Sequence, residues 1–306
     1  MKNLTKMLMW FAAPLLFIIA AIGWPSKKAT PQTSDVVLIG AGDISDGFDF
    51  QLAGAFATAA LLDANPSATV FADGDLAYNE GSDADFLKSY DPTWGRAKAR
   101  TIPVPGNHDY SIQKGIGYYN YFGPAAGDPA KGYYSLDLGA WHIVVLNSNC
   151  QSIGCGAGGS QETWLKNDLA AHTQTCTLAL WHEPLYTSVD PSAGVVPNLS
   201  VQPLWQDLYD ANADLIVNGH AHNYERFAPQ DANANLDPAR GIVEIITGTG
   251  GDSHHDFSTT IAANSLARNN DTFGVLEVTL HPSSFDWQFI PVAGKTFTDS
   301  GTQVCH

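Results

Sequence analysis

Residues 214–226 read DLIVNGHAHNYER, and this stretch decides how the rest of the chain is interpreted. Its apolar run ends at Val217 and is typical of a buried strand. Gly219 follows, and glycine lets a backbone turn sharply off a strand end. His220 and His222 come next with one residue between them, so their imidazoles can face different partners. Two adjacent metal ions would need ligands placed in this way.

The same pattern occurs at other places in the chain. Short apolar runs over residues 36–39, 69–72, 101–104 and 177–180 each lead into polar residues. The residues that follow these runs are Gly42-Asp43, Gly74-Asp75 with Tyr78, Gly106-Asn107-His108-Asp109, and Trp181-His182. Apolar runs of this length that alternate with helical stretches indicate buried strands of an α/β sheet. Ligands bind at the carboxyl ends of strands in such sheets, so we expect these side chains to converge on one site.

The residue types in this set indicate which ions would bind. The candidate metal ligands are Asp43, Asp75, Tyr78, Asn107, His182, His220 and His222. The set contains no cysteine, which argues against a structural zinc ribbon. It is too large for one transition metal and suits two ions about 3.5–4 Å apart that share a carboxylate, an arrangement that serves phosphate ester hydrolysis. Taken singly, Asp43 would be a turn residue and Tyr78 a buried aromatic, but the motifs together favour a metal site.

In this order the motifs GD, GDxxY, GNHD, H and GHxH resemble those of the calcineurin-like metallophosphoesterase superfamily, from about residue 35 to the C-terminus. Most of the superfamily has a histidine two residues after the first Asp, where this chain has Ser45. The purple acid phosphatase branch has instead a tyrosine after the second Asp, as Tyr78 is here, and the residues NYER at 223–226 also fit that branch.

The resemblance implies both a fold and a cofactor. The fold would be a four-layer α/β/β/α sandwich of two mixed sheets flanked by helices. Asp43, Tyr78 and His222 would bind one metal ion, expected to be Fe(III), and Asp75 would bridge it to a divalent ion, Fe, Zn or Mn. The ligands implied for the divalent ion are Asn107, His182 and His220. A metal-bound hydroxide would then attack the phosphorus of a phosphomonoester.

His108 is the candidate catalytic residue. It follows Asn107 but is not itself expected to be a ligand, so it would contact a phosphate oxygen or protonate the leaving alkoxide. Related enzymes often have a further substrate-contacting histidine in the loop after the divalent-metal histidine. Here residues 183–194 follow His182 and contain none, which favours broader or weaker activity.

The remaining histidines have different expected roles. His254 and His255 follow a glycine-rich loop at 248–251, and one of the pair is a candidate for contact with the phosphate. His142 lies within an apolar strand pattern and is expected to be structural. The histidines expected to face solvent are His172, His281 and His306.

The N-terminal segment predicts export. Lys2 and Lys6 precede an apolar run over residues 7–24, which is typical of a secretory signal and just long enough to span a membrane. We predict a signal peptide or N-terminal membrane anchor at 1–24, a linker at 25–34 and one metallophosphoesterase domain at 35–306. The protein is expected to be secreted or extracytoplasmic, and to contact a membrane only through an uncleaved leader.

Charge and cysteine content limit the partners and the compartment. The net charge of −16, from 31 acidic and 15 basic residues, excludes nucleic acid as an expected partner, because phosphate backbones require a basic surface. Small phosphate esters would be attracted by the metals. The four cysteines, at 150, 155, 176 and 305, fit an oxidising compartment, and their three alternative pairings stay open.

Other segments are predicted to form the scaffold. Helices are expected at 50–64, at 161–171 with Ser160 as N-cap, and at 201–211 with Trp205 and Leu208 inward. Strands of a second sheet are expected at 139–146, 241–246, 273–280 and 285–292.

The leading functional hypothesis is a secreted dinuclear-metal phosphomonoesterase. A phosphodiesterase on the same scaffold is the nearest alternative, since loop shape decides the substrate. A secreted metal-binding protein with little catalysis would predict broken motifs, and the ligand positions are all intact. Di-iron redox chemistry is disfavoured, because ferritin-like sites use Glu-x-x-His motifs on helices that this chain lacks.

Overall fold

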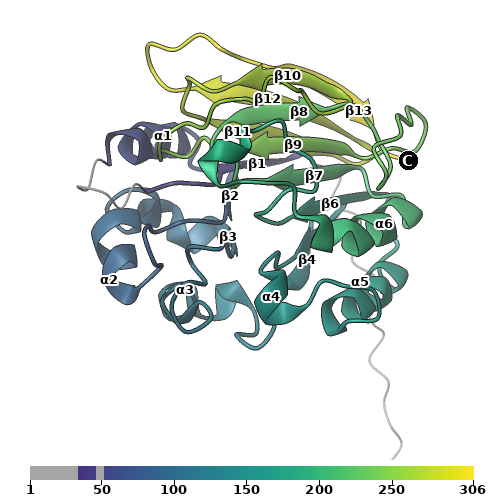
Figure 1. Ribbon diagram of the computed structural model, residues 1–306, viewed down its shortest axis with the longest axis horizontal. Helices are drawn as coiled ribbons and strands as arrows, with labels where there is room; N and C mark the ends of the chain where they lie inside the picture. Colours follow the sequence, from purple (N-terminus) through teal and green to yellow (C-terminus); the bar gives the residue numbers. More distant parts are fainter. Residues whose placement is uncertain (1–33, 46–51) are drawn as a thin grey trace, which may run out of the picture. The chain divides into compact units, whose positions relative to one another are not determined.

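Two mixed β-sheets organise residues 34–45 and 52–306, which are the residues that the computed structural model describes (Figure 1). The first sheet has the strand order β13-β12-β11-β1-β2-β3. Its strands are β1 (Val36–Ala41), β2 (Thr69–Asp73), β3 (Thr101–Val104), β11 (Gly274–His281), β12 (Ser284–Pro291) and β13 (Ser300–Val304). β1, β2 and β3 are parallel, whereas β11 pairs antiparallel with β1.

The second sheet has the strand order β10-β8-β9-β7-β6-β5-β4. Its strands are β4 (Tyr134–Leu138), β5 (Trp141–Val145), β6 (Cys176–Leu180), β7 (Leu215–Asn218), β8 (Tyr224–Phe227), β9 (Val243–Thr247) and β10 (Ser265–Asn269). β5, β6, β7 and β9 are parallel to one another, and the outer strands pair antiparallel. All strand runs expected from the sequence are therefore confirmed as strands.

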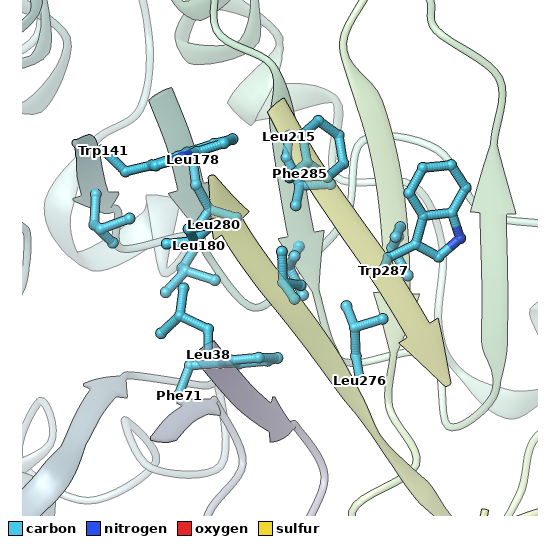
Figure 2. Packing of buried hydrophobic residues seen from close by; sticks show 14 of the residues in the cluster. Leu38, Phe71, Trp141, Leu178, Leu180, Leu215, Leu276, Leu280, Phe285 and Trp287 are labelled. Carbon is cyan, nitrogen blue, oxygen red and sulfur yellow. The ribbon is translucent and has the colours of Figure 1, made fainter. Parts of the chain in front are cut away.

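The two sheets pack face to face around one apolar core (Figure 2). Leu38, Phe71 and Phe285 from the first sheet lie in the same cluster as Trp141 and Leu178 from the second. All five side chains are at most 1% exposed, so alternate residues of each strand contribute to the layer between the sheets. Burial of side chains this large stabilises the fold by about 1.5–3 kcal/mol each.

Helices cover the outer face of each sheet. The helices are α1 (Ala53–Ala64), α2 (Asp83–Asp85), α3 (Ile116–Phe122), α4 (Cys150–Ile153), α5 (Ser160–Ala171) and α6 (Gln202–Asp210). Shorter helical turns lie at Phe86–Tyr90, Trp94–Arg100, Gly123–Ala126, Pro191–Ala193 and Leu199–Val201. Leu62 of α1 and Phe122 of α3 pack on the first sheet, while Leu165 of α5 and Trp205 of α6 pack on the second. The expected four-layer α/β/β/α sandwich is confirmed.

Several expectations about single elements need correction. The strands at 273–280 and 285–292 belong to the first sheet, not the second, because β11 is apolar on both faces and lies beside β1. The N-cap of α5 is Gly159 and not Ser160, which is the first residue of the helix. The helix expected at 50–64 is α1, and its first residues lie outside the described part.

Other calls fall on residues that the structure does not describe. The leader at 1–24 and nearly all of the linker at 25–34 lie outside the described residues. Within the part that is described, no helix is both long and apolar enough to cross a membrane. In α6, by contrast, Trp205 and Leu208 are fully buried, as the sequence predicts.

Two disulfide bonds settle the cysteine pairing. Cys150 is bonded to Cys155, and Cys176 is bonded to Cys305. The second bond joins residues 129 positions apart and fixes the C-terminus to the start of β6. Asp214 holds the same end of the chain, because its carboxylate accepts the N–H of His306 at 2.9 Å.

We expect the Cys176→Ser/Cys305→Ser variant to lose about 2–5 kcal/mol of unfolding free energy, because the long loop would be free in the unfolded chain. The control is the Cys150→Ser/Cys155→Ser variant. The bond that it removes joins residues only 5 positions apart, so this variant should lose less unfolding free energy. Denaturant unfolding of both variants measures the difference. Equal losses of unfolding free energy would show that the length of the closed loop does not contribute to the effect of the Cys176–Cys305 bond.

Candidate metal centre

The carboxyl ends of strands from both sheets meet at one place. β1, β2 and β3 of the first sheet lead into it, and so do β6 and β7 of the second. Hydrogen bonds connect the two sheets there: Gly42 N donates to Thr247 O at 2.9 Å, and His220 N donates to the Asp43 carboxylate at 2.8 Å. The structure thus brings together side chains that are distant in sequence.

Unusual backbone conformations aim three of the candidate ligands. Asp43, Asp75 and His220 have φ angles of 58°, 51° and 67°, in the left-handed region that residues with side chains rarely adopt. Each follows a glycine. A Cβ atom on Gly219 would lie 2.7 Å from the carbonyl oxygen of Asp73, so the glycine is needed for close approach. His220 itself makes the sharp turn that the sequence assigns to Gly219.

A first group of ligand atoms surrounds the hydroxyl of Tyr78. This oxygen lies 3.0 Å from Asp43 Oδ1, 3.0 Å from His222 Nε2 and 3.2 Å from Asp75 Oδ2. His222 Nε2 is itself 3.2 Å from Asp43 Oδ1. Tyr78 is 5% exposed, and its only polar atom faces the carboxylates rather than the apolar core. The geometry therefore favours a ligand role for Tyr78 over that of a simple buried aromatic.

A second group lies on the other side of Asp75. Its carboxylate, His182 and His220 each offer a ligand atom within 4.8 Å of the others. The imidazoles of His182 and His220 have ring centres 5.1 Å apart. Asn107 lines the same cavity as Asp75 and His220.

One oxygen atom of Asp75 belongs to both groups. Oδ2 lies 3.2 Å from the Tyr78 hydroxyl and 3.1 Å from His182 Nε2. The other oxygen, Oδ1, accepts the backbone N–H of His108 at 2.8 Å, which orients the carboxylate. Gly106 permits this arrangement, because a Cβ there would lie 2.1 Å from Asp75 Oδ1.

Backbone carbonyls fix two of the imidazole rings. Nδ1 of His182 donates to Asp73 O at 2.8 Å, and Nδ1 of His222 donates to Ser253 O at 2.7 Å. A carbonyl can only accept, so each neutral ring has its lone pair on Nε2, the atom that faces the carboxylates. Metal-binding histidines are commonly held by such hydrogen bonds.

Burial and charge set the protonation of the cluster. Burial opposes ionisation of Asp75, but the charge of His182 outweighs it and lowers the pKa of Asp75. Burial, together with the charge of His182, lowers the pKa of His220 to about 4, so His220 is a neutral imidazole near pH 7. Burial also opposes the charged form of His222, but Asp43 outweighs it and raises the pKa of His222 to about 9.

Several atoms of the cluster lack the partner that a metal ion would supply. Asn107 Oδ1 and His182 Nε2 are buried without a hydrogen bond to any described residue. His182 Nε2 does lie near Asp75, but not in hydrogen-bond geometry. Burial and the nearby Asp43 carboxylate raise the pKa of Tyr78 well above its usual value, and a cation is what would stabilise its phenolate. The donor set therefore fits a pair of metal ions.

A cavity of about 450 Å³ opens onto this cluster. His108 lines it with a side chain that is 38% exposed, and the ring lies over Tyr78 with centres 4.6 Å apart. Its Nδ1 donates to Asn79 O at 2.6 Å, which leaves Nε2, 4.0 Å from Asp75 Oδ2, as the free ring nitrogen. The ring is thus placed beside the ligand cluster without belonging to it.

Comparison with known proteins identifies the family to which the chain belongs. A family model described as calcineurin-like phosphoesterase matches residues 15–224, more than half of the chain. The chain belongs to this phosphoesterase family. Among curated relatives, purple acid phosphatase 15 of Arabidopsis thaliana is 29% identical over 183 residues, which cover 54% of this chain and 33% of the relative. Probable inactive purple acid phosphatase 1 of the same plant is 27% identical over 269 residues, which cover 76% and 42%.

A solved structure of purple acid phosphatase PPD1 from yellow lupin has the same fold. The superposition has a TM-score of 0.72 at 19% identity and covers 89% of this chain and 54% of the lupin chain. Within that family, the chain is thus similar to purple acid phosphatases in sequence and in fold. It spans between a third and about two fifths of the length of the two Arabidopsis relatives.

The two consecutive histidines, His254 and His255, have different environments. His255 lines the cavity, and its ring stacks on that of His222 with centres 3.9 Å apart. Its Nδ1 accepts the N–H of His222 at 3.3 Å, so a neutral ring carries its proton on Nε2 and can donate it to a substrate oxygen. His254 packs against Phe273 with ring centres 4.2 Å apart and does not line the cavity. Contact of either histidine with phosphate stays a prediction, and the geometry favours His255.

Sequence reasoning missed two carboxylates of the site. Asp252 lines the cavity and lies 3.8 Å from His222 Nδ1. Asp109 is buried behind the site, where it accepts the N–H groups of Gly106 at 2.9 Å and Leu76 at 3.2 Å. Burial raises its pKa to about 7, and the charge of Asp75 adds to this. Asp109 ends the GNHD motif, so its place in that motif is the signal that could have identified it.

The other histidines lie away from the site. His142 is buried in β5 between Asp137 and Asp168, which supports a structural role. His172 stacks on His142 and is 31% exposed, and His281 on the first sheet is 27% exposed. His306 was expected to face solvent, but its side chain is only 8% exposed and packs against Asp214. The expectation for His306 is wrong because the Cys176–Cys305 bond draws the C-terminus inward.

Proposed function

We propose that this protein hydrolyses phosphomonoesters with a dinuclear metal centre. The observation that carries the proposal is Asp75 Oδ2, which lies between the Tyr78 hydroxyl and His182 Nε2 at 3.2 and 3.1 Å. A carboxylate in this position can bridge two cations that have otherwise separate ligands. Asp43, Tyr78 and His222 would hold Fe(III). The residues that would hold a divalent ion, Fe, Zn or Mn, are Asn107, His182 and His220.

The metal pair would supply an activated water and charge stabilisation for the phosphoryl oxygens. The chain supplies the rest of the chemistry. His108 donates Nδ1–H to Asn79 O and presents Nε2 to the cavity, and in its doubly protonated form it would give the Nε2 proton to the leaving alkoxide. The bond between phosphorus and the ester oxygen breaks, a water oxygen replaces it, and an alcohol and inorganic phosphate leave.

The charge of the cavity bears on the substrate. Of the described residues that line it, none is Lys or Arg, while Asp75 and Asp252 are acidic. A phosphate group would therefore depend on the metals, His108 and the Nε2–H of His255. A phosphodiester carries one negative charge less than a monoester dianion, so phosphodiester hydrolysis is the second candidate activity.

Metal analysis and parallel assays test the proposal. The purified protein should contain two metal ions per chain and hydrolyse an aryl phosphate monoester faster than the matching diester. Removal of the metals by a chelator should abolish both activities, and their return should restore them. A protein that binds no metal, or that binds two ions and hydrolyses neither ester, would refute the proposal.

We expect wild-type protein to be coloured and the Tyr78→Phe variant to be colourless with the same fold. The band would arise from charge transfer between the phenolate and Fe(III), and phenylalanine has no oxygen to supply it. The matched control is Tyr118→Phe, because Tyr118 belongs to α3 and is buried in the cluster between the helices and the first sheet. Absorption and circular dichroism spectra measure colour and fold. A colourless, fully loaded wild type would show that Tyr78 does not bind Fe(III).

The proposal places the protein outside the cytoplasm. Both pairs of cysteines are oxidised, which is typical of secreted and extracytoplasmic proteins. A leader peptide, and a membrane anchor in its place, stay predictions.

A further inference from the structure

A second cavity borders the metal centre. It has a volume of about 310 Å³, and its lining includes Asn107, Gln151, Ser152, Glu183, Asn198 and Ser200. Asn107 lines this cavity and the larger cavity over the ligand cluster. The loop after β6 also borders both, because residues 193–195 line the larger cavity and Asn198 and Ser200 line the smaller one. A group attached to a phosphate at the metals would therefore reach the smaller cavity across Asn107.

Hydrogen bonds connect the walls of this cavity to residues next to the candidate metal ligands. Asn149 Nδ2 donates to Gly106 O at 3.2 Å, next to the candidate ligand Asn107. Asn198 Nδ2 donates to the Glu183 carboxylate at 2.9 Å, and Glu183 follows the candidate ligand His182. The Cys150–Cys155 bond closes the loop that carries α4. The smaller cavity is consequently positioned by the same backbone that positions the ligands.

The chemistry of the lining is polar and nearly uncharged. Apart from the bonded Cys150, every lining side chain carries an amide, a hydroxyl or a carboxylate. The hydroxyl of Tyr110 already accepts from Asn147 Nδ2 at 2.7 Å. In the part of the chain that the structure describes, the side chains of Gln151, Ser152 and Ser200 make no hydrogen bond, so they remain available to a ligand. An apolar group would desolvate these amides and hydroxyls without replacing their partners, which is unfavourable.

The charges exclude an anionic group from this cavity. None of its described lining residues is Lys, Arg or His, and Glu183 contributes a carboxylate. A second phosphate on the substrate would therefore be repelled by Glu183 and would find no cationic side chain in this lining. The volume lies at the lower end of the range for ligand pockets, about 300–1,000 Å³, and suits a group as small as a hexose.

Resting on the proposed function, we infer that the smaller cavity is a subsite for the leaving group and that it binds an uncharged polyhydroxylated alcohol. The substrate class is then the monophosphate of a sugar or polyol, in which the single phosphate is at the metals. Gln151, Ser152 and Ser200 determine specificity by hydrogen-bonding the hydroxyl groups of the substrate.

Three esters test the inference on the metal-loaded protein: glucose 6-phosphate, fructose 1,6-bisphosphate and phenyl phosphate. Wild-type protein should have a kcat/KM about tenfold higher for glucose 6-phosphate than for the bisphosphate, whose leaving group is anionic. The Gln151→Ala/Ser200→Ala variant should lose about tenfold more kcat/KM on glucose 6-phosphate than on phenyl phosphate, as expected for two lost hydrogen bonds. Gln288→Ala, an exposed change on β12 away from both cavities, should alter neither rate.

A variant that fills the cavity provides a second test. Ser152→Trp should exclude the hexose, so its loss on glucose 6-phosphate should exceed its loss on phenyl phosphate by at least about tenfold. Equal losses on the two esters in both variants, or a preference for the bisphosphate in the wild type, would overturn the subsite. Circular dichroism checks that both variants are folded.

Failure of the subsite can be separated from failure of the proposed function. If the wild type hydrolyses none of the three esters, the proposed function fails, and calorimetric titration of the metal-loaded protein with glucose 6-phosphate still decides the subsite. Binding that is about tenfold weaker in Gln151→Ala/Ser200→Ala, with no such change for phenyl phosphate, would support it. Undetectable binding to the wild type, or equal affinities in wild type and variant, would refute it.

Discussion

Replacement of Asp75 by alanine should abolish hydrolysis and remove both metal ions. Asp75 Oδ2 lies within 3.2 Å of an atom of each ligand group, so the substitution would remove a ligand from both metal ions. The two cations would also lose the negative charge that offsets their mutual repulsion. We expect activity to fall by at least about 1,000-fold, since most of the rate enhancement depends on the metals. Metal content by mass spectrometry and the rate on an aryl phosphate measure the two effects.

Two further variants separate charge from structure. Asp75→Asn keeps the size and one oxygen but removes the charge, and it should also lose metal. Asp63→Ala is the matched control, because Asp63 is an exposed carboxylate paired with Arg96 on the surface. It should retain two metal ions and full activity. Two bound metal ions in Asp75→Ala would contradict the bridging role.

The convergence of the candidate ligands could be predicted from sequence because it depends on strand ends. A buried strand has a clear apolar pattern, and the fold places the ends of β1, β2, β3, β6 and β7 together whatever their order in the chain. Asp43 and His220 are 177 positions apart in sequence, and yet the N–H of one is bonded to the carboxylate of the other. The pattern did not reveal that the ligands themselves adopt left-handed backbone conformations.

Features that depend on tertiary packing were not predictable in the same way. The assignment of 273–280 to the second sheet failed because an apolar pattern shows that a strand is buried but not which strand it pairs with. The choice between His254 and His255 depended on which side of a loop faces Phe273. His306 is buried because of a bond to a cysteine far away in sequence, which no local pattern records. The polar cavity beside Asn107 is likewise built from four separate segments.

The second large effect is expected at His108. The His108→Ala variant should lose about 100- to 10,000-fold in turnover, the usual contribution of a positioned proton donor. Both metal ions should remain, because the ligand cluster forms without its imidazole: Asp75 Oδ1 is held by the backbone N–H of residue 108, which alanine retains. His281→Ala, at a partly exposed histidine paired with Asp35 and Asp286, is the control and should change neither quantity.

The dependence on leaving group decides what His108 does. A proton donor matters most when the leaving alkoxide is strongly basic, so the loss in His108→Ala should be larger for alkyl phosphates than for aryl phosphates. Nε2 of His108 is directed to the cavity because Nδ1–H is bonded to Asn79 O, so the doubly protonated ring would donate its proton from Nε2. Equal losses on both classes of ester would assign His108 to phosphate binding instead. Loss of metal from the variant would instead show that His108 is a metal ligand and would contradict its assignment as a proton donor.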